Sequence, residues 1–369
     1  MRLIHLISSN HWGGAWQYAL DLCSHFLGKG WKVTALTCDA KAVDDRFRGA
    51  GVGLRHAPLR GLFDPASALI LSSMLKEIPA GEGIVHVHRY RDAFTALLAR
   101  RLAKRPDIRV VATRHSVRRG RDTRLFRRIY RNVDAHIFVS HLAYDAFRTT
   151  WEPAPAPLPD GRVHIIHNSL NLPDSPPPGE PEKGPVTAMY HGPLVEGKGL
   201  ETIIDALVSL RDLKMRMKIC GKGSPDFLDK LRRRAMTRGV MEMIDWNTSA
   251  KEAESAIAES HFGVQPSMER EAFGLENLRY MRCGRAQVCC ANGAQREFLA
   301  DGVTALFVPP ADAHALAEAM RRLASDQTLR RRLGENARKE FDIRLSWDIF
   351  TRRMRKIYYN ELNIEGEIF

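Results

Sequence analysis

Apolar and polar positions over residues 1–168 alternate between short apolar runs and longer amphipathic segments. The runs predict strands at 2–8, 31–37, 52–58, 83–88, 108–115, 135–140 and 162–168. The amphipathic segments predict helices, and the first of them, 14–30, has Trp16, Ala19 and Cys23 at helical spacing and ends on a glycine. Strands that alternate with helices indicate a parallel sheet with helices on both faces.

The alternation stops at residues 172–187, which are rich in proline, glycine and charge and are therefore expected to form a linker. It then restarts, with strands expected at 186–192, 214–221, 241–246, 261–267, 286–290 and 305–310 and with closing helices near 326–340 and 345–361. The pattern predicts an N-terminal Rossmann-like domain (1–171), a second Rossmann-like domain (188–345) and a C-terminal segment (346–369) whose helix crosses back to the first. Ligands of doubly wound sheets bind at the carboxyl ends of the strands, so the cleft between the two domains is the expected site.

Composition narrows the protein class. The 369 residues are too many for one hydrophobic core as a first expectation, and their 44% apolar content is that of a globular protein. No uncharged apolar run reaches 18 residues, so no membrane span is predicted, and the first apolar run is too short for a signal peptide. The six cysteines lack metal-ligand spacing and lie in apolar surroundings, which indicates reduced thiols in a cytoplasmic protein.

The formal net charge of +13 predicts a polyanionic partner: nucleic acid, an anionic membrane surface or a phosphorylated substrate. An arginine-rich composition alone accounts for part of it. Residues 117–132 hold seven arginines, one aspartate and an apolar stripe, and they are expected to form a basic amphipathic helix. This helix predicts peripheral contact with an anionic membrane; the alternative is a solvated face that binds acceptor phosphates. No RNA-recognition or zinc-finger pattern is present, so nucleic acid is not the expected partner.

Several motifs occur in a characteristic order. "WGG" follows the first predicted strand, "TRH" follows a central one, and "HN" precedes the linker. The second half contains "HGPLVEGKG", "CGKG", "QPSMEREAFGL", "MRCG" and "DGVTALFVPPAD". The chain resembles the retaining GT-B glycosyltransferases of family 4 (glycosyl transferases group 1), which build lipopolysaccharide, capsule and exopolysaccharide sugars. The resemblance extends over nearly the whole chain and is more specific in its C-terminal half.

The resemblance implies transfer of a hexosyl group from a nucleoside diphosphate sugar to a glycan or glycolipid, with retention and without a metal ion or other cofactor. Lys198 matches the lysine that neutralises the diphosphate, a charge that basic side chains and helix N-termini stabilise. Glu271 matches the carboxylate that contacts the donor sugar. By the same resemblance, Phe273, Gly274 and Leu275 are expected to provide the backbone that holds phosphate oxygens. The alternatives are a solvent-exposed lysine and a carboxylate that only favours a helix N-terminus.

Two residues depart from the family pattern. Pro193 stands where the family has an arginine, and Arg279 stands where it has the glutamate that binds the ribose. Three interpretations follow. Arg279 replaces the charge missing at Pro193, the ribose is recognised differently, or the donor site has been lost. The first two describe an active enzyme, which is the expected case because Lys198 and Glu271 are retained.

The remaining site residues lie in loops after predicted strands. Gly13 and Gly14 are expected to let the backbone approach a phosphate or the acceptor, and a tight turn is the alternative. His115 matches a residue beside the transferred sugar, although a hydrogen-bonded loop histidine explains it as well. Gly192, Gly221 and Gly223 are expected at the nucleotide. Asn168 is interpreted as a hinge and turn residue.

The sequence thus predicts a cytoplasmic, metal-independent, retaining glycosyltransferase with a peripheral membrane contact. Two other functions remain open. One is an impaired family member that serves as partner or scaffold of an active transferase. The other is a GT-B sugar-nucleotide epimerase, although the carboxylate pair for its acid–base chemistry is not evident. A nucleic-acid binder would explain the charge but not the motifs. The donor base, the sugar and the acceptor do not follow from the sequence.

Overall fold

The computed structural model describes residues 1–172, 181, 184–247 and 253–359. The chain divides into two compact units. Unit 1 contains Met1–Asn168 and the C-terminal segment from Trp347, and unit 2 is Ser169–Ser346. Most of the predicted linker, 173–180 with 182 and 183, lies outside the described residues.

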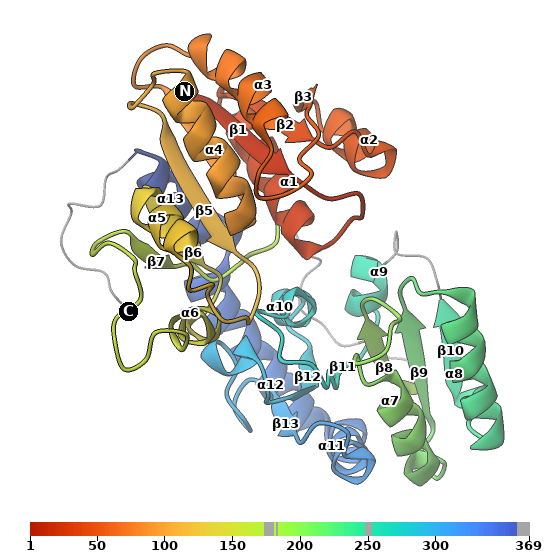
Figure 1. The fold of residues 1–369 in the computed structure, drawn as a ribbon. Coiled ribbons are helices and arrows are strands. Elements are labelled where there is room, and N and C mark those ends of the chain that lie inside the picture. Colours follow the sequence, from red (N-terminus) through yellow and green to blue (C-terminus); the bar gives the residue numbers. More distant parts are fainter. Residues whose placement is uncertain (173–180, 182–183, 248–252, 360–369) are drawn as a thin grey trace. The chain divides into compact units, whose positions relative to one another are not determined.

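Unit 1 is a seven-stranded parallel sheet in the order β3-β2-β1-β4-β5-β6-β7. Figure 1 shows α4 in front of this sheet and α13 behind it. Its elements are β1 (Arg2–Ile7), α1 (Gly14–Gly28), β2 (Lys32–Thr37), α2 (Lys41–Gly49), β3 (Gly53–His56), α3 (Pro65–Lys76), β4 (Gly83–Val87), α4 (Tyr90–Leu102), β5 (Arg109–Arg114), α5 (Arg124–Asn132), β6 (Ala135–Phe138), α6 (His141–Arg148), β7 (Val163–Ile165) and α13 (Trp347–Tyr359).

Unit 2 has a six-stranded parallel sheet in the order β10-β9-β8-β11-β12-β13. Its elements are β8 (Val186–His191), α7 (Leu200–Leu207), β9 (Met215–Cys220), α8 (Pro225–Thr237), β10 (Ile244–Asn247), α9 (Ala253–Ala258), β11 (Phe262–Gln265), α10 (Leu275–Arg282), β12 (Ala286–Cys290), β13 (Leu306–Val308), α11 (Ala313–Ser325) and α12 (Gln327–Glu340). Both sheets follow the Rossmann order, with the third strand at one edge and the first strand beside the fourth. The predicted pair of doubly wound α/β domains is confirmed.

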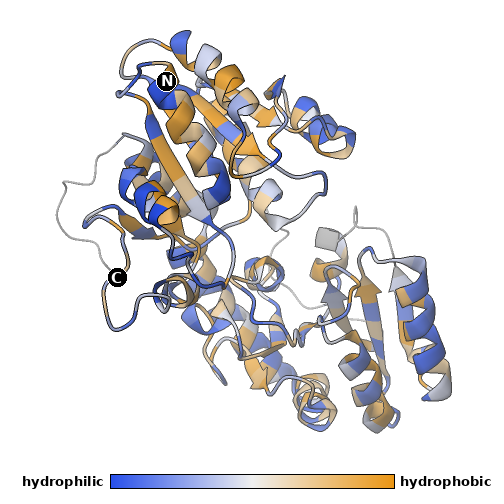
Figure 2. Cartoon of the chain, in the orientation of Figure 1, coloured by the Kyte–Doolittle hydropathy of each residue, from blue (hydrophilic) through white to orange (hydrophobic). Residues whose placement is uncertain are grey.

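Each sheet is buried between helices, as its nearly continuous apolar strands require. Figure 2 shows hydrophobic colours on the strands and hydrophilic colours on the outer helix faces. Helix α13 belongs to the core of unit 1, because its residues Phe350, Met354, Ile357 and Tyr358 are buried against α1 and the sheet. In unit 2 the larger core packs the sheet on α7, α8, α11 and α12, and a smaller one packs it on α9 and α10.

Two predicted elements differ from the structure. The basic helix α5 begins at Arg124 rather than at 117, because the Thr123 hydroxyl caps it by accepting from the amide of Phe126. Its apolar stripe is mostly internal, with Phe126, Ile129 and Tyr130 buried in unit 1. That stripe is therefore not available to a membrane. The predicted strand at 241–246 starts with a short 3₁₀ turn, Met241–Met243, and only then becomes β10.

Within the part of the chain that the structure describes, no helix combines the length and the apolarity needed to cross a membrane.

Candidate active site

The strand order of unit 2 reverses between β8 and β11, and the loops after these two parallel strands meet. The amide of Met268 in the second loop donates a 2.8 Å hydrogen bond to the carbonyl of Gly197 in the first. Gly199 allows this contact, since a Cβ at that position would lie 2.0 Å from the carbonyl oxygen of Pro266. Ligands of doubly wound folds bind at such a reversal. Loops 192–199 and 266–274 therefore form the candidate site of unit 2.

Lys198 and Glu271 meet at the centre of this site. Lys198 Nζ donates to Glu271 Oε1 over 2.5 Å, and Glu269 Oε2 lies 3.8 Å from the same nitrogen. The Lys198 and Glu271 side chains are 18% and 13% exposed, whereas Glu269 is 62% exposed. Burial alone would lower the pKa of Lys198, but Glu271, Glu276 and Glu269 raise it above its usual value. Lys198 is therefore a cation that the protein already holds in place.

Glu276, in the first turn of α10, extends the site. Burial raises the pKa of this carboxyl, the charge of Glu271 raises it further, and Lys198 opposes the shift. The side chain lies against the first loop, because a Cβ at Gly192 would be 3.4 Å from Glu276 Cγ. Carboxylates accept hydrogen bonds from hydroxyl groups, and an ammonium pairs with phosphate. Together they suit a ligand that has both groups.

The backbone at the start of α10 approaches the same carboxylate. Gly274 is in the left-handed region, with a φ of 84°. A Cβ there would lie 2.8 Å from Glu271 Oε2 and 2.7 Å from Asn277 Nδ2. Phe273 is buried, with its ring centroid 4.8 Å from that of Phe298. The buried ring anchors the turn, and the first amides of α10, beginning at Leu275, start a helix N-terminus of the kind that attracts anions.

The loop after β9 runs beside the loop after β8. The amide of Leu194 donates to the carbonyl of Lys222 over 2.8 Å. A Cβ at Gly221 would lie 1.8 Å from the carbonyl oxygen of Gly192, and one at Gly223 would lie 2.2 Å from that of Leu194. Gly221 and Gly223, two of the glycines expected at the nucleotide, are thus required by the close approach of two loops.

Unit 1 has the same reversal, between β1 and β4. Gly13 ends the loop after β1 and precedes α1, which begins at Gly14. The φ of Gly13 is −171°, and a Cβ there would meet nothing within 4 Å. The fold itself therefore does not require a glycine at position 13, unlike at position 199.

His115 follows β5, on the same edge of the sheet. Its ring packs edge-on against Tyr18, with centroids 4.8 Å apart, and its Nε2 lies 3.2 Å from His88 Nδ1. Burial lowers the pKa of His115 to about 3, so the ring is neutral at physiological pH. Such a ring can donate or accept a hydrogen bond but cannot provide positive charge to a leaving group.

The comparison with known families covers both units. The model for glycosyl transferases group 1 matches residues 174–340, and the model for glycosyltransferase family 4 matches residues 12–173. Together they span 12–340. The chain belongs to the family 4 glycosyltransferases. The family expected from its motifs is confirmed.

Three curated relatives agree with this assignment. A phosphatidyl-myo-inositol mannosyltransferase of Mycobacterium leprae is 26% identical over 367 residues, 94% of this chain and 92% of its own. An O-antigen chain mannosyltransferase of Escherichia coli is 26% identical over 294 residues, 76% and 77% of the two chains. An uncharacterized glycosyltransferase of Methanocaldococcus jannaschii is 27% identical over 199 residues. This match spans 53% of each of the two chains, about half of the relative's length.

Among solved structures, Anabaena HepE in complex with UDP has the same fold. Its TM-score is 0.78 at 15% identity, and the match covers 97% of this chain and 99% of the other. The predicted GT-B architecture is thereby confirmed.

Arg279, the departure from the family pattern, lies on α10 near the end of β8. Burial and, to a smaller extent, the charge of Arg279 together lower the pKa of His191, the last residue of β8, to about 4. In this glycosyltransferase the arginine is thus close to the point where the strand order reverses. Pro193, the other departure, accepts a 2.8 Å hydrogen bond through its carbonyl from the Tyr190 hydroxyl.

Sequence reasoning missed the histidines behind His115. His5 on β1, His86 on β4 and His88 just after β4 are all buried. The strand "GIVHVH" places His86 and His88 two residues apart, so that both face the same side of the sheet. Two histidines on one face of a strand that is otherwise apolar were the signal that could have revealed them.

Proposed function

We propose that this glycosyltransferase moves a hexose from a nucleoside diphosphate sugar to a glycan or glycolipid precursor of a bacterial surface polysaccharide, with retention and without a metal ion. The relatives support this substrate class, since they include an O-antigen chain mannosyltransferase and a phosphatidyl-myo-inositol mannosyltransferase. Among solved structures, HepE has been observed with UDP-glucose, and a similar fold occurs in a lipopolysaccharide outer core galactosyltransferase.

The Lys198–Glu271 pair is the observation on which the proposal rests. The 2.5 Å contact fixes the ammonium group of Lys198 next to a carboxylate, at the point where the strand order of unit 2 reverses. In the proposed complex, Lys198 leaves Glu271 and pairs with the diphosphate, and Glu271 then accepts hydrogen bonds from sugar hydroxyls. The leaving diphosphate develops charge in the transition state, where a preorganised cation is worth most. The chain needs no protein nucleophile if the leaving phosphate takes the acceptor proton on the same face.

Calorimetry with UDP, GDP, ADP and CDP, each in the presence of EDTA, tests the donor site. We expect micromolar binding of one nucleotide, and we expect Glu271→Gln to weaken the matching nucleotide sugar more than the free nucleotide. Once the donor is known, NMR of the product shows the anomeric configuration. Binding only with a divalent metal, or an inverted product, would contradict the corresponding part of the proposal.

One set of observations favours a second candidate, an impaired member that serves as a scaffold. Pro193 and Arg279 replace two expected donor contacts, and Lys198 already interacts with three carboxylates, those of Glu271, Glu276 and Glu269. The variant Arg279→Glu separates the two functions. If wild type binds a nucleotide and the variant binds it less tightly, Arg279 is a donor contact. If wild type binds none and the variant does, the donor site has been lost and the scaffold role is the better description.

We also propose a peripheral contact with anionic membranes through the arginines of 117–132. The exposed ones are Arg118, Arg119, Arg121, Arg124, Arg128 and Arg131. Because the apolar stripe of α5 is buried, this contact is electrostatic and weakens with salt. We expect binding to vesicles that contain phosphatidylserine, little binding to neutral vesicles, and loss of binding in Arg124→Glu/Arg128→Glu. The matched control Arg331→Glu/Arg332→Glu changes two exposed arginines of unit 2 and keeps the binding.

A further inference from the structure

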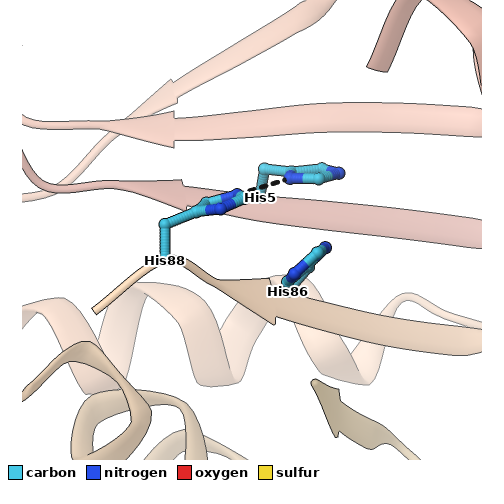
Figure 3. A group of neighbouring side chains, drawn as sticks. All are labelled: His5, His86 and His88. Carbon is cyan, nitrogen blue, oxygen red and sulfur yellow. Dashed lines mark hydrogen bonds between the residues drawn. The ribbon is translucent and has the colours of Figure 1, made fainter. Parts of the chain in front are cut away.

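Three imidazole rings stack in the centre of unit 1. The rings of His5 and His88 are 13° from parallel with centroids 5.2 Å apart, and those of His86 and His88 are 29° from parallel at 4.6 Å (Figure 3). One nitrogen of each ring lies within 4.8 Å of the others, as in a metal site. Stacked rings, however, do not point their lone pairs at one common centre. Both nitrogens of His86 are also engaged, each at 2.7 Å, by the hydroxyls of Tyr358 and Thr113.

The arrangement is better described as a hydrogen-bonded chain from the core to the edge of the sheet. His5 Nδ1 lies 3.0 Å from His88 Nε2 (Figure 3), and His88 Nδ1 lies 3.2 Å from His115 Nε2. Burial lowers the pKa of His5 and of His115 to about 3 and that of His88 well below its usual value. The rings of His5, His88 and His115 are therefore neutral, and each carries one N–H and one lone pair.

Neutral rings in such a chain must all donate in the same direction, so only two arrangements exist. In one, His115 donates to His88, which donates to His5, and His5 Nε2 then carries an N–H. In the other, His5 donates from Nδ1 to His88, which donates from Nδ1 to His115. His5 Nε2 then carries a lone pair, and the proton of His115 is on Nδ1.

The environment of His5, at the inner end of the hydrogen-bonded histidine chain, decides between the two arrangements. His5 is fully buried, and its Nε2 has no hydrogen-bond partner among the residues that the structure describes. Among buried backbone groups, an N–H without an acceptor is rarer than a carbonyl without a donor, and we apply the same preference to the ring nitrogen. The arrangement that leaves a lone pair on His5 Nε2 is therefore favoured over the one that leaves a proton there.

We infer that His5 and His88 hold His115 in the tautomer protonated on Nδ1, so that His115 offers a neutral N–H donor at the carboxyl edge of the unit 1 sheet. Nδ1 of His115 has no partner within the described ranges, and it is not among the fully buried atoms. Its chemical partner is an oxygen acceptor, namely a hydroxyl oxygen of the sugar or of the acceptor. That assignment rests on the proposed function, whereas the tautomer rests on the histidine chain alone. His5 and His88 are positioning residues.

Nitrogen NMR of the wild-type protein tests the tautomer without any assay of activity. Histidine-selective ¹⁵N labelling gives two-bond correlations that distinguish protonated from unprotonated ring nitrogens, and His115→Asn identifies the signals of His115. At neutral pH we expect protonated Nδ1 and unprotonated Nε2 in both His88 and His115. Protonation of His115 on Nε2 would overturn the inference.

Two variants of His88 then connect the tautomer with the reaction. An asparagine amide replaces the Nδ1 position of histidine, and a glutamine amide replaces the Nε2 position. His88→Asn keeps a donor to His115, so the tautomer of His115 and kcat should stay closer to those of the wild type. His88→Gln loses it, and we expect His115 to become a mixture of tautomers and kcat to fall about tenfold, the equivalent of one hydrogen bond. A role in packing alone would affect both variants alike.

The outcomes separate the inference from the proposed function. Protonation on Nδ1 together with unchanged kcat in both His88→Gln and His115→Ala would place His115 away from the reaction, while the tautomer assignment stands. Thermal unfolding of both His88 variants serves as the folding control. If neither variant folds, the wild-type spectrum still decides the tautomer.

Discussion

The two units share a strand order, but different side chains lie where that order reverses. They are charged in unit 2 and include a cluster of neutral histidines in unit 1. In unit 2 the loops after β8 and β11 and the first turn of α10 bring together a lysine and three carboxylates. Burial alone would lower the pKa of Lys198, but the three carboxylates together raise it. In unit 1 the ends of β1, β4 and β5 present histidines whose pKa values burial lowers far enough to keep them neutral. The same Rossmann strand order therefore presents a charged cluster in unit 2 and a cluster of neutral imidazole rings in unit 1.

The difference follows from where the residues lie. Lys198, Glu269 and Glu271 of unit 2 are in loops, and Glu276 is in the first turn of α10. Burial opposes the charge of Lys198, but the three neighbouring carboxylates raise its pKa and keep the ammonium protonated. The histidines of unit 1 are on strands or directly after them, inside the sheet, where ionisation would cost several kcal/mol. If unit 2 binds a diphosphate sugar, charge is needed there, and neutral hydrogen-bond donors are sufficient where hydroxyl groups react.

The largest effect is expected from the central pair of unit 2. Lys198→Ala and Glu271→Gln should each lower kcat/KM by about a hundredfold to a thousandfold, the loss seen when a preorganised electrostatic contact to a transition state is removed. The matched control is Lys230→Ala, since Lys230 is 54% exposed and pairs with Glu196 on the surface. It should change kcat/KM by less than about fivefold. Steady-state kinetics with the identified donor measure all three. Equal losses in the control would show that general positive charge matters rather than this site.

Two loop glycines are expected to respond in opposite ways. Gly199→Ala places a Cβ 2.0 Å from a carbonyl oxygen at a φ of 77°, and it should destabilise the protein by about 3 kcal/mol. Gly13→Ser meets no neighbour and keeps a good N-cap for α1, so we expect less than about 0.5 kcal/mol. If position 13 must admit a ligand, Gly13→Ser nevertheless raises KM. Thermal unfolding and kinetics of both variants measure this contrast, and a stable Gly199→Ala would contradict the close approach of the loops.

Much of the fold could be predicted because each unit repeats a simple local pattern. The apolar runs predicted each of the thirteen strands found in the described residues to within a few positions, since both faces of a parallel sheet are covered. The predicted start of α5 at residue 117 was wrong. The prediction followed the run of arginines that begins at Arg118 and did not use Thr123 as the N-cap. Periodicity also indicated that α5 has an apolar stripe. It could not show what the stripe packs against, and in the structure the stripe packs against the core of unit 1.

The candidate site was predictable only where its residues lie in recognisable loops. Lys198 and Glu271 are 73 positions apart, and their contact depends on β8 and β11 being neighbours, which the resemblance implied but no local pattern shows. His5 and His88 are 83 positions apart, and on a buried strand each is read as a core residue. Contacts across a sheet depend on strand order, and strand order does not follow from the periodicity of single segments.

A carboxyl of unit 1 extends the comparison to stability. Asp92, in the first turn of α4, is buried and accepts a 2.5 Å hydrogen bond from the Ser8 hydroxyl. Burial raises its pKa from 3.8 to about 6, although Ser8, Arg91 and Arg89 oppose the shift. The folded protein therefore binds this proton more tightly than the unfolded chain. Its contribution to stability is complete below pH 3.8 and is lost as the pH rises through about 6.

Asp92→Asn should remove this dependence, because an amide cannot ionise. At pH 7 we expect the variant to be more stable than wild type by up to about 3 kcal/mol, and at pH 4 the two should be nearly equal. Thermal unfolding from pH 4 to pH 8 measures the difference. A variant that is less stable at pH 7 would show that the ionised carboxylate is stabilised by Arg91 more than burial destabilises it. The reversal in unit 1 would then be stabilised by an ion pair between Arg91 and Asp92, and the contrast with unit 2 would weaken.

The smallest expected effect separates two glutamates of the same loop. Glu269 lies 3.8 Å from Lys198 but is 62% exposed, whereas Glu271 is 13% exposed and lies at 2.5 Å. Solvent screens the first interaction, so Glu269→Gln should change kcat/KM by less than about fivefold, far less than Glu271→Gln. Measuring both variants at low and at high salt sharpens the test, because only the Glu269 effect should fall with ionic strength. Equal effects would mean that unit 2 acts through the summed charge of its loop, and that the buried Lys198–Glu271 contact has no special role.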